Sequence, residues 1–200
     1  MTTDAFTFHF KSASAPPGKG IHEHADPTAY STLKNSPLWR RALSDYWESP
    51  FTYSDGHRYN TVTHLMQAKK LTLSSRNHGI PFEMCSGFIF SIDSGHPFST
   101  MPGSFINTIE YADLFNDFEL EEWNSIKDEI REEALFAKFS QYAALRIVLL
   151  ATGDAQLWNQ QGPFFAAKRP HRDFQLERVR RVLLQANSSF TPYEGQSDSE

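Results

Sequence analysis

The stretch ALSDYWESPFTYSDGHRYNTVTHLMQAKK, residues Ala42–Lys70, holds the two strongest structural signals in this chain. Asp55-Gly56 is a favoured hairpin turn, and the aromatic-rich segments on either side of it predict two short antiparallel strands. Asn60 or Thr61 then caps the start of a helix. The core side of that helix carries apolar residues at helical spacing: Val62, Leu65, Met66 and Leu73. A hairpin followed directly by a helix is typical of an α+β fold.

On the N-terminal side of this stretch, the sequence predicts a strand, a loop and a helix. Aromatic residues alternate with polar ones in FTFHF, residues 6–10, which indicates a half-buried strand. A Pro/Gly-rich loop follows it. We expect the helix over Ala29–Leu43, with Asp26 as its N-cap and Pro27 in its first turn.

On the C-terminal side, helical signals dominate. Residues 76–118 show no sustained period, so we expect loops there, with one short strand near Phe88–Ile92. A long helix is predicted from Leu120 to Tyr142, a second one ends at Gly153, and a third covers Phe174–Gln185. The stripe that should face the core in the long helix is Trp123, Ile126, Ile130, Ala134, Ala137 and Gln141.

Length and composition predict one domain. The chain has 200 residues, which suits a single domain, and 17 phenylalanines that can furnish one sizeable core. We therefore expect a single α+β domain over residues 1–186, rich in helix, with a small antiparallel sheet. The last segment, residues 187–200, is polar and is predicted to be a disordered tail.

Several features predict a soluble, cytoplasmic protein with no membrane contact. No apolar run approaches the roughly 18–20 residues that span a bilayer, and the first residues lack the pattern of a signal peptide. The single cysteine, Cys85, cannot form an internal disulfide, which fits a reducing compartment. The net charge of -5 argues against broad non-specific affinity for nucleic acid.

The segment SAPPGKGIHEHADP, Ser14–Pro27, places Lys19 between two glycines. It is no Walker-type phosphate loop, because that loop needs a glycine five residues before its Gly-Lys pair and a Ser or Thr after the lysine. His22 and His24 form a His-x-His pair, but no third ligand stands at a recognisable spacing. We expect neither a metal site nor a cofactor.

Four segments, in this order, resemble the NADAR (YbiA-like) family, linked to NAD and ADP-ribose chemistry. They are PPGKGIHE (Pro16–Glu23), Ala42–Lys70, EEALFAKFSQ (Glu132–Gln141) and LLATGDAQL (Leu149–Leu157). The resemblance implies cleavage of an N-glycosidic bond at a ribose. The substrate classes that it implies include ADP-ribose attached to guanine bases and ribosylated intermediates of the riboflavin pathway.

The chain departs from the family pattern at two places that matter for this chemistry. Thr63 stands where the family usually has glutamate, and Asp45 stands where it usually has asparagine. Glycosidic cleavage passes through an oxocarbenium-like state that carboxylates normally stabilise, and threonine carries no charge. Either Asp45 supplies the lost carboxylate, or the domain has lost catalysis and kept its fold.

The resemblance also implies roles for the Lys19 loop. If neutral, the Lys19 amine can form a Schiff base with a ring-opened ribose, and the flanking glycines would let the substrate approach; otherwise Lys19 is a solvated residue of a flexible loop. Glu23 would orient Lys19 or act as the general acid/base, and its alternative is an exposed loop acid. The catalytic candidates are therefore Lys19, Glu23 and Asp45.

The remaining candidates would bind substrate. His64 and Gln67, with Thr63, lie at the start of a helix, where backbone N–H groups favour anions. The alternative interpretation is that these residues cap the helix and form a buried polar pair. Trp47, beside Tyr46, would stack on a base if it does not belong to the core. Lys138 and Gln141 match a family segment but equally fit a solvated helix face.

The sequence thus leaves two functions open. One is an N-glycosidase-like domain acting on an ADP-ribosyl or related ribosyl-nucleotide group, which a nucleic-acid base can carry. The other is a catalytically silent domain used for binding or assembly with protein partners, such as a component of a virus particle. The basic run Lys168–Arg181 either holds phosphates or forms a charged amphipathic helix.

Overall fold

The computed structural model describes residues 4–8, 15–20, 23–74, 87–108, 114–159 and 171–188. Helices make up most of this part of the chain, which confirms the helix-rich α+β class. Its elements, in chain order, are β1 (Ala5–Phe8), α1 (Ser31–Lys34), α2 (Trp39–Ala42), β2 (Phe51–Thr52), β3 (Arg58–Tyr59), α3 (Val62–Ser74), the 3₁₀ turns η2 (Phe88–Phe90), η3 (Ile92–Ser94) and η4 (Pro97–Thr100), α5 (Gly103–Ile106), α6 (Asp117–Gln141), α7 (Ala143–Leu150), β4 (Gln156–Asn159), β5 (His171–Arg172) and α8 (Phe174–Ser188).

The strands form two small sheets. The first has the order β1-β4-β5, in which β1 and β4 run parallel with Phe6 opposite Leu157, and β4 and β5 run antiparallel. The second is the predicted hairpin, in which β2 and β3 pair antiparallel with Phe51 opposite Tyr59. The expectation of an antiparallel sheet is therefore wrong for the larger sheet, which is mixed. A parallel pair needs a long crossover, and here that crossover contains most of the chain.

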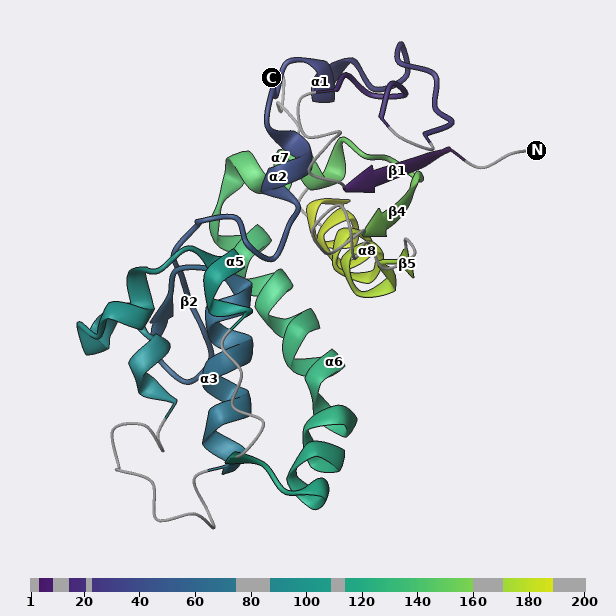
Figure 1. The fold of residues 1–200 in the computed structure, drawn as a ribbon. Helices are drawn as coiled ribbons and strands as arrows, with labels where there is room; N and C mark the ends of the chain where they lie inside the picture. Colours follow the sequence, from purple (N-terminus) through teal and green to yellow (C-terminus); the bar gives the residue numbers. More distant parts are fainter. Residues whose placement is uncertain are drawn as a thin grey trace, which may run out of the picture.

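The long helix α6 lies between two other helices. Figure 1 shows α3 running beside it on one side and α8 on another, and α6 contacts both. The core-facing residues of α6 are Ala134, Leu135 and Phe139, whereas Gln141 of the predicted stripe is exposed. The predicted stripe corresponds to a helix with one buried face, but a helix that is packed on two sides buries residues from more than one face.

The core joins the mixed sheet to α2 through aromatic rings. Phe6 on β1 is 0% exposed, and its ring lies edge-on to Trp39 of α2, with centroids 5.1 Å apart. Phe6 meets Tyr30 in the same way at 4.7 Å. Such edge-to-face pairs add to the stability that burial of the rings already gives. The short helix α2 is thereby fixed against β1.

Two predicted elements are wrong. The helix expected over Ala29–Leu43 is split into α1 and α2, because Pro37 lies between them and restricts the residue before it. Asp26 caps no helix there; its carboxylate accepts hydrogen bonds from the main chain and hydroxyl of Thr28. The strand expected near Phe88–Ile92 is instead the turns η2 and η3, and Ser91 between them makes a single bridge to Tyr59.

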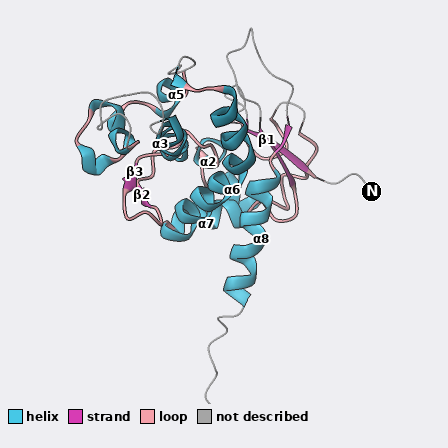
Figure 2. Cartoon of the chain, turned by 90° about the horizontal axis from the view of Figure 1, so that it is seen from below, coloured by secondary structure: helices cyan, strands magenta, loops and turns pink. Residues whose placement is uncertain are grey.

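The last helix, α8, packs on β4, and its final turns project from the body of the molecule (Figure 2). It ends at Ser188, and the predicted tail beyond it lies outside the described residues. Within the described ranges, no helix is both long and apolar enough to cross a membrane.

Candidate functional site

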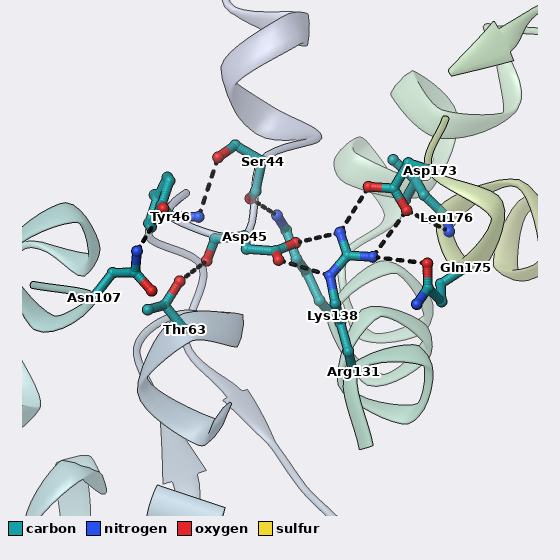
Figure 3. Close-up of polar contacts among 10 residues, drawn as sticks. All are labelled: Ser44, Asp45, Tyr46, Thr63, Asn107, Arg131, Lys138, Asp173, Gln175 and Leu176. Atoms are coloured by element: carbon teal, nitrogen blue, oxygen red, sulfur yellow. Dashed lines mark hydrogen bonds and ion pairs between the residues drawn. The ribbon is translucent and has the colours of Figure 1, made fainter. Parts of the chain in front are cut away.

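The loop after α2, residues 43–47, receives a buried amine from α6 (Figure 3). The side chain of Lys138 is 0% exposed, and its Nζ donates hydrogen bonds to the main-chain oxygens of Ala42 and Ser44, both at 2.8 Å. Burial lowers the pKa of this amine to about 7, and the charge of Asp45 opposes that shift. The interpretation of Lys138 as part of a solvated helix face is therefore wrong.

Two helical turns before Lys138, Arg131 joins two carboxylates from distant parts of the chain. Its guanidinium donates to Asp45 at 2.7 and 3.0 Å and to Asp173 at 2.8 and 2.7 Å. Burial would lower the pKa of Arg131, but Asp45 and Asp173 hold it well above its ordinary value. Burial likewise would raise the pKa of Asp173, yet the bond to Arg131 leaves it below its ordinary value. The Asp45 carboxylate is thus one partner in a three-residue ion pair.

Thr63 meets the main chain of Asp45 rather than its carboxylate. The amide and the hydroxyl of Thr63 both donate to the Asp45 carbonyl oxygen, each at 3.3 Å. Figure 3 shows the carboxylate on the other side of that residue, turned toward Arg131. Thr63 is 5% exposed. The place of the expected glutamate is filled by a neutral hydroxyl, and the neighbouring carboxylate faces away from it.

His64 is fully buried and is held through both ring nitrogens. Its Nε2 lies 3.1 Å from the Phe98 carbonyl oxygen, so it carries the proton, and its Nδ1 accepts from the Thr61 hydroxyl at 2.8 Å. Burial lowers the pKa of His64 to about 4, which keeps the ring neutral. Thr61 also accepts from the His64 amide, which confirms it as the cap of α3. Gln67 is half-buried on the next turn of that helix.

The Lys19 loop is attached to α2 by a buried ion pair. Arg40, which is 1% exposed, forms a fork with the Glu23 carboxylate and also donates to the carbonyl oxygens of Ala15 at 3.2 Å and Pro16 at 2.9 Å. Glu23 in turn accepts from the Gly20 amide at 3.0 Å. Glu23 is therefore no exposed loop acid, while the side chain of Lys19 is exposed.

The aromatic and amide candidates take structural positions. Trp47 is half-buried and packs on the core, and the hydroxyl of Tyr46 accepts from the Asn107 side chain at 3.1 Å. At the end of α6, the Gln141 side chain accepts from the Thr52 amide at 2.9 Å and donates to the Thr52 carbonyl at 2.7 Å. Gln141 is thus a partner of strand β2.

Three arginines of the basic run, Arg172, Arg178 and Arg180, have partners within the chain. Arg172 forms an ion pair with Glu177 at 2.8 Å, and Arg178 forms a more exposed one with Glu132 at 2.9 Å. Arg180 is 7% exposed and donates to the Thr152 hydroxyl and the Ala155 carbonyl. These contacts fit the charged amphipathic helix rather than a phosphate site.

The structure thus brings the candidates into two groups. Asp45, Thr63 and Lys138 meet at the loop after α2, and Lys19 and Glu23 belong to the loop held by Arg40. Helix α2 connects the two groups, although the described contacts include none between Lys19 and Asp45. Arg40 and Arg131 were missed by the sequence analysis. The one available signal was the spacing of Arg131, Leu135 and Lys138, which puts two cations on a buried helix row.

A groove lies elsewhere, between the hairpin loop, α6 and α8. It encloses about 510 Å³, and none of the predicted site residues lines it. Its walls are Tyr53, Ser54, Glu132, Glu133, Phe136, Ala137, Val179 and Val182. In the part of the chain that the structure describes, no three His, Cys, Asp or Glu side chains gather as metal ligands.

Comparisons with known proteins agree on one family. The model of the NADAR domain matches residues 34–162. Proteins named N-glycosidase YbiA, from Shigella flexneri serotype 5b (strain 8401) and Shigella sonnei (strain Ss046), are 51% identical over 35 residues, or 18% of this chain. The match spans only 22% of the length of each of these relatives. The NMR structure of the E. coli protein YbiA aligns with a TM-score of 0.55 and 19% identity, over 78% of this chain and 85% of that chain, which is a likeness of fold.

Proposed function

Because this chain belongs to the NADAR domain family, we propose that it is an N-glycosidase-like domain for a ribosyl-nucleotide group. The group that we propose is an ADP-ribosyl unit, for example on a nucleic-acid base. The name N-glycosidase of the YbiA relatives supports the type of reaction. The observation that carries the proposal is the Lys19 loop, because it presents an exposed amine on a backbone that a buried ion pair holds in place.

In the proposed reaction, the neutral Lys19 amine attacks the anomeric carbon of the ribose. A bond forms between the lysine nitrogen and that carbon, and the N-glycosidic bond breaks with its electron pair going to the base. The proton released from the lysine nitrogen returns to the departing base through water. Opening of the ribose ring then gives an imine, which one water molecule hydrolyses to ADP-ribose and the free amine.

Trapping the imine tests this function. The chain is incubated with ADP-ribosylated guanosine in the presence of sodium borohydride and then digested for mass spectrometry. We expect a reduced sugar-phosphate adduct on the peptide that contains Lys19, and no adduct in Lys19→Arg. Hydrolysis that continues undiminished in Lys19→Arg would remove Lys19 from the reaction.

A second function, binding without catalysis, is favoured by the state of the carboxylates. Glu23 and Asp45 are each held by an arginine fork, and Thr63 supplies no charge. A silent domain would keep its ligand, so ADP-ribose should raise the thermal midpoint while ADP-ribosylated guanosine stays intact. No thermal shift at millimolar ADP-ribose would exclude a nucleotide pocket and leave assembly with a protein partner as the function.

A further inference from the structure

We propose that Arg40 is a positioning residue that holds the Lys19 amine in place through the main chain on both sides of it. This inference rests on the proposed function, because it assigns the task of Arg40 in that reaction. It also gives Glu23 a task other than proton transfer, namely to complete the clamp. We call Arg40, Glu23 and the main chain of residues 15–20 the loop clamp.

The loop clamp binds the backbone before and after Lys19. Before it, Arg40 holds the carbonyl oxygens of Ala15 and Pro16. The Pro16 oxygen also accepts from the Lys19 amide at 3.1 Å, so Arg40 and Lys19 share this acceptor. After Lys19, the Gly20 amide donates to the Glu23 carboxylate that Arg40 pairs with. The backbone is therefore held by one buried ion pair at Pro16, before Lys19, and at Gly20, after it.

Burial of this ion pair sets it apart from ordinary surface pairs. The side chains of Arg40 and Glu23 are 1% and 0% exposed, whereas that of Lys19 is exposed. Taking two charges out of water is costly, and burying them does not by itself favour folding over an apolar pair of the same size. Stability alone therefore does not account for the buried Arg40–Glu23 pair. The pair instead defines one geometry for residues 15–20, which is what an attacking amine requires.

The two glycines beside Lys19 pack closely against neighbouring residues and do not face open solvent. Gly18 has a φ of +74°, and a Cβ on it would lie 2.3 Å from the Ala25 carbonyl oxygen. A Cβ on Gly20 would lie 2.5 Å from the Glu23 carboxylate. These contacts explain both glycines without any substrate. Access of substrate to the amine is therefore not needed to explain why glycines stand at these two positions.

The clamp is anchored to the core of the molecule. The Arg40 guanidinium lies over the Trp39 ring, with Cζ 4.0 Å from its centroid, and Trp39 packs on Phe6 of β1. The chain of contacts runs from β1 through α2 to the loop, and Phe6, Trp39 and Arg40 in it are buried. The Lys19 backbone is therefore fixed relative to β1 and α2.

The first test measures the clamp without any substrate. Trypsin cleaves after an exposed lysine only where the backbone can become extended, so a clamped turn resists it. We expect Arg40→Met and Glu23→Gln to raise the rate of cleavage after Lys19 by at least about tenfold, read by intact mass. The matched control is Arg41→Met, which removes the exposed arginine of the same helix and should leave the rate unchanged. Equal rates in all four proteins would overturn the clamp.

Global unfolding would also let trypsin cleave after Lys19, so the thermal midpoint of each variant is measured by circular dichroism. If Arg40→Met does not fold, Arg40→Lys and Glu23→Gln carry the test, because the first keeps both charges without the planar fork and the second keeps the size of the carboxylate. In either of them, cleavage confined to Lys19 below the midpoint supports the clamp. Cleavage spread over buried sites as well assigns Arg40 a role in the whole fold and overturns the proposal.

The second test separates positioning from a merely structural role. With ADP-ribosylated guanosine, the rate of borohydride-trapped adduct on Lys19 should fall at least about tenfold in Arg40→Lys, while the thermal shift by ADP-ribose is kept. An unchanged adduct rate in a variant whose loop trypsin cleaves faster would overturn the positioning role. Absence of adduct in the wild type would contradict the proposed function instead, and the trypsin result would still decide the clamp.

Discussion

Thr63 occupies the buried first turn of α3, where the family resemblance predicts glutamate, and its hydroxyl donates only to the Asp45 carbonyl oxygen. If this loss of charge limits catalysis, Thr63→Glu should raise hydrolysis of ADP-ribosylated guanosine. General acid–base groups contribute about 10²–10⁴-fold, so chromatography of the released base would detect the gain. Thr63→Gln is the matched control, since it has the same size without the charge.

Asp45 is the competing candidate for the carboxylate role. If it compensates for Thr63, the wild type should already hydrolyse the substrate, and Asp45→Asn should lose that activity. We expect the gain in Thr63→Glu rather than the loss in Asp45→Asn, because the Asp45 carboxylate pairs with Arg131 on the side away from Thr63. Activity unchanged by both substitutions would mean that neither position carries the role.

His64 should make the fold sensitive to mild acid. Its pKa is lowered from 6.5 to about 4 by burial, so the unfolded chain binds this proton at a higher pH than the folded one. Stability is therefore lost as pH falls from above 6.5 toward 4. Between pH 7.5 and 5 the loss should be about 2 kcal/mol. Urea unfolding of the wild type and of His64→Gln measures it, and His171→Gln, an exposed histidine, is the control. An equal pH dependence in all three would contradict the prediction.

At the scale of single elements, Gln141 holds the hairpin to the end of α6. Its amide makes the two hydrogen bonds with Thr52 that a neighbouring strand would make. We expect Gln141→Ala to speed hydrogen exchange of the Thr52 amide by about fivefold, because a net hydrogen bond stabilises by about 1 kcal/mol. Gln141→Glu keeps the acceptor and loses the donor, so it should protect that amide better than alanine does. Exchange that is the same in all three proteins would show that Gln141 does not hold the strand.

Elements with local signals were predicted well. The hairpin follows from Asp55-Gly56, and α3 begins at the predicted Thr61 cap. Helix α6 begins at Asp117, a few residues before the predicted start, because Asn116 and Glu119 form a capping box. Each of these signals lies within a few residues of the structure that it specifies, so the sequence shows it directly.

Elements and contacts that depend on distant residues were not predicted. The parallel pairing of β1 with β4 joins residues about 150 positions apart, and no local pattern specifies it. The same holds for the site. Arg131 pairs with Asp45 and Asp173, and Arg40 pairs with Glu23. These residues are far apart in the sequence, and no helical or strand periodicity relates them. The sequence indicated Asp45 and Glu23 through the family resemblance but not the arginines that hold them.

At the scale of the whole molecule, Arg131 links three segments that are far apart in the sequence: the loop after α2, helix α6 and the start of α8. Arg131→Met would leave two buried carboxylates without their partner. Breaking a buried ion pair in this way costs about 3–5 kcal/mol. Urea unfolding should show this loss, together with a lower thermal midpoint.

The control for Arg131 is Arg178→Met. Arg178 also joins α8 to α6, through Glu132, but its side chain is 55% exposed. Such exposed pairs contribute about 0–1 kcal/mol. A loss in Arg131→Met no larger than that in Arg178→Met would show that the three-residue ion pair does not hold the segments together.

The two buried arginines also bear on how much of the chain folds by itself. The segment that the family model matches, residues 34–162, contains Arg40 and Arg131 but neither Glu23 nor Asp173. It contains β4 but neither of its neighbours in the sheet, β1 and β5. A protein trimmed to that segment would leave Arg40 without its carboxylate, Arg131 with only one of its two and β4 without a neighbouring strand, so it should aggregate rather than fold. The cooperatively folding unit therefore extends beyond the segment that the family model matches at both ends. A fusion protein that contains this domain should include the residues on both sides of that segment.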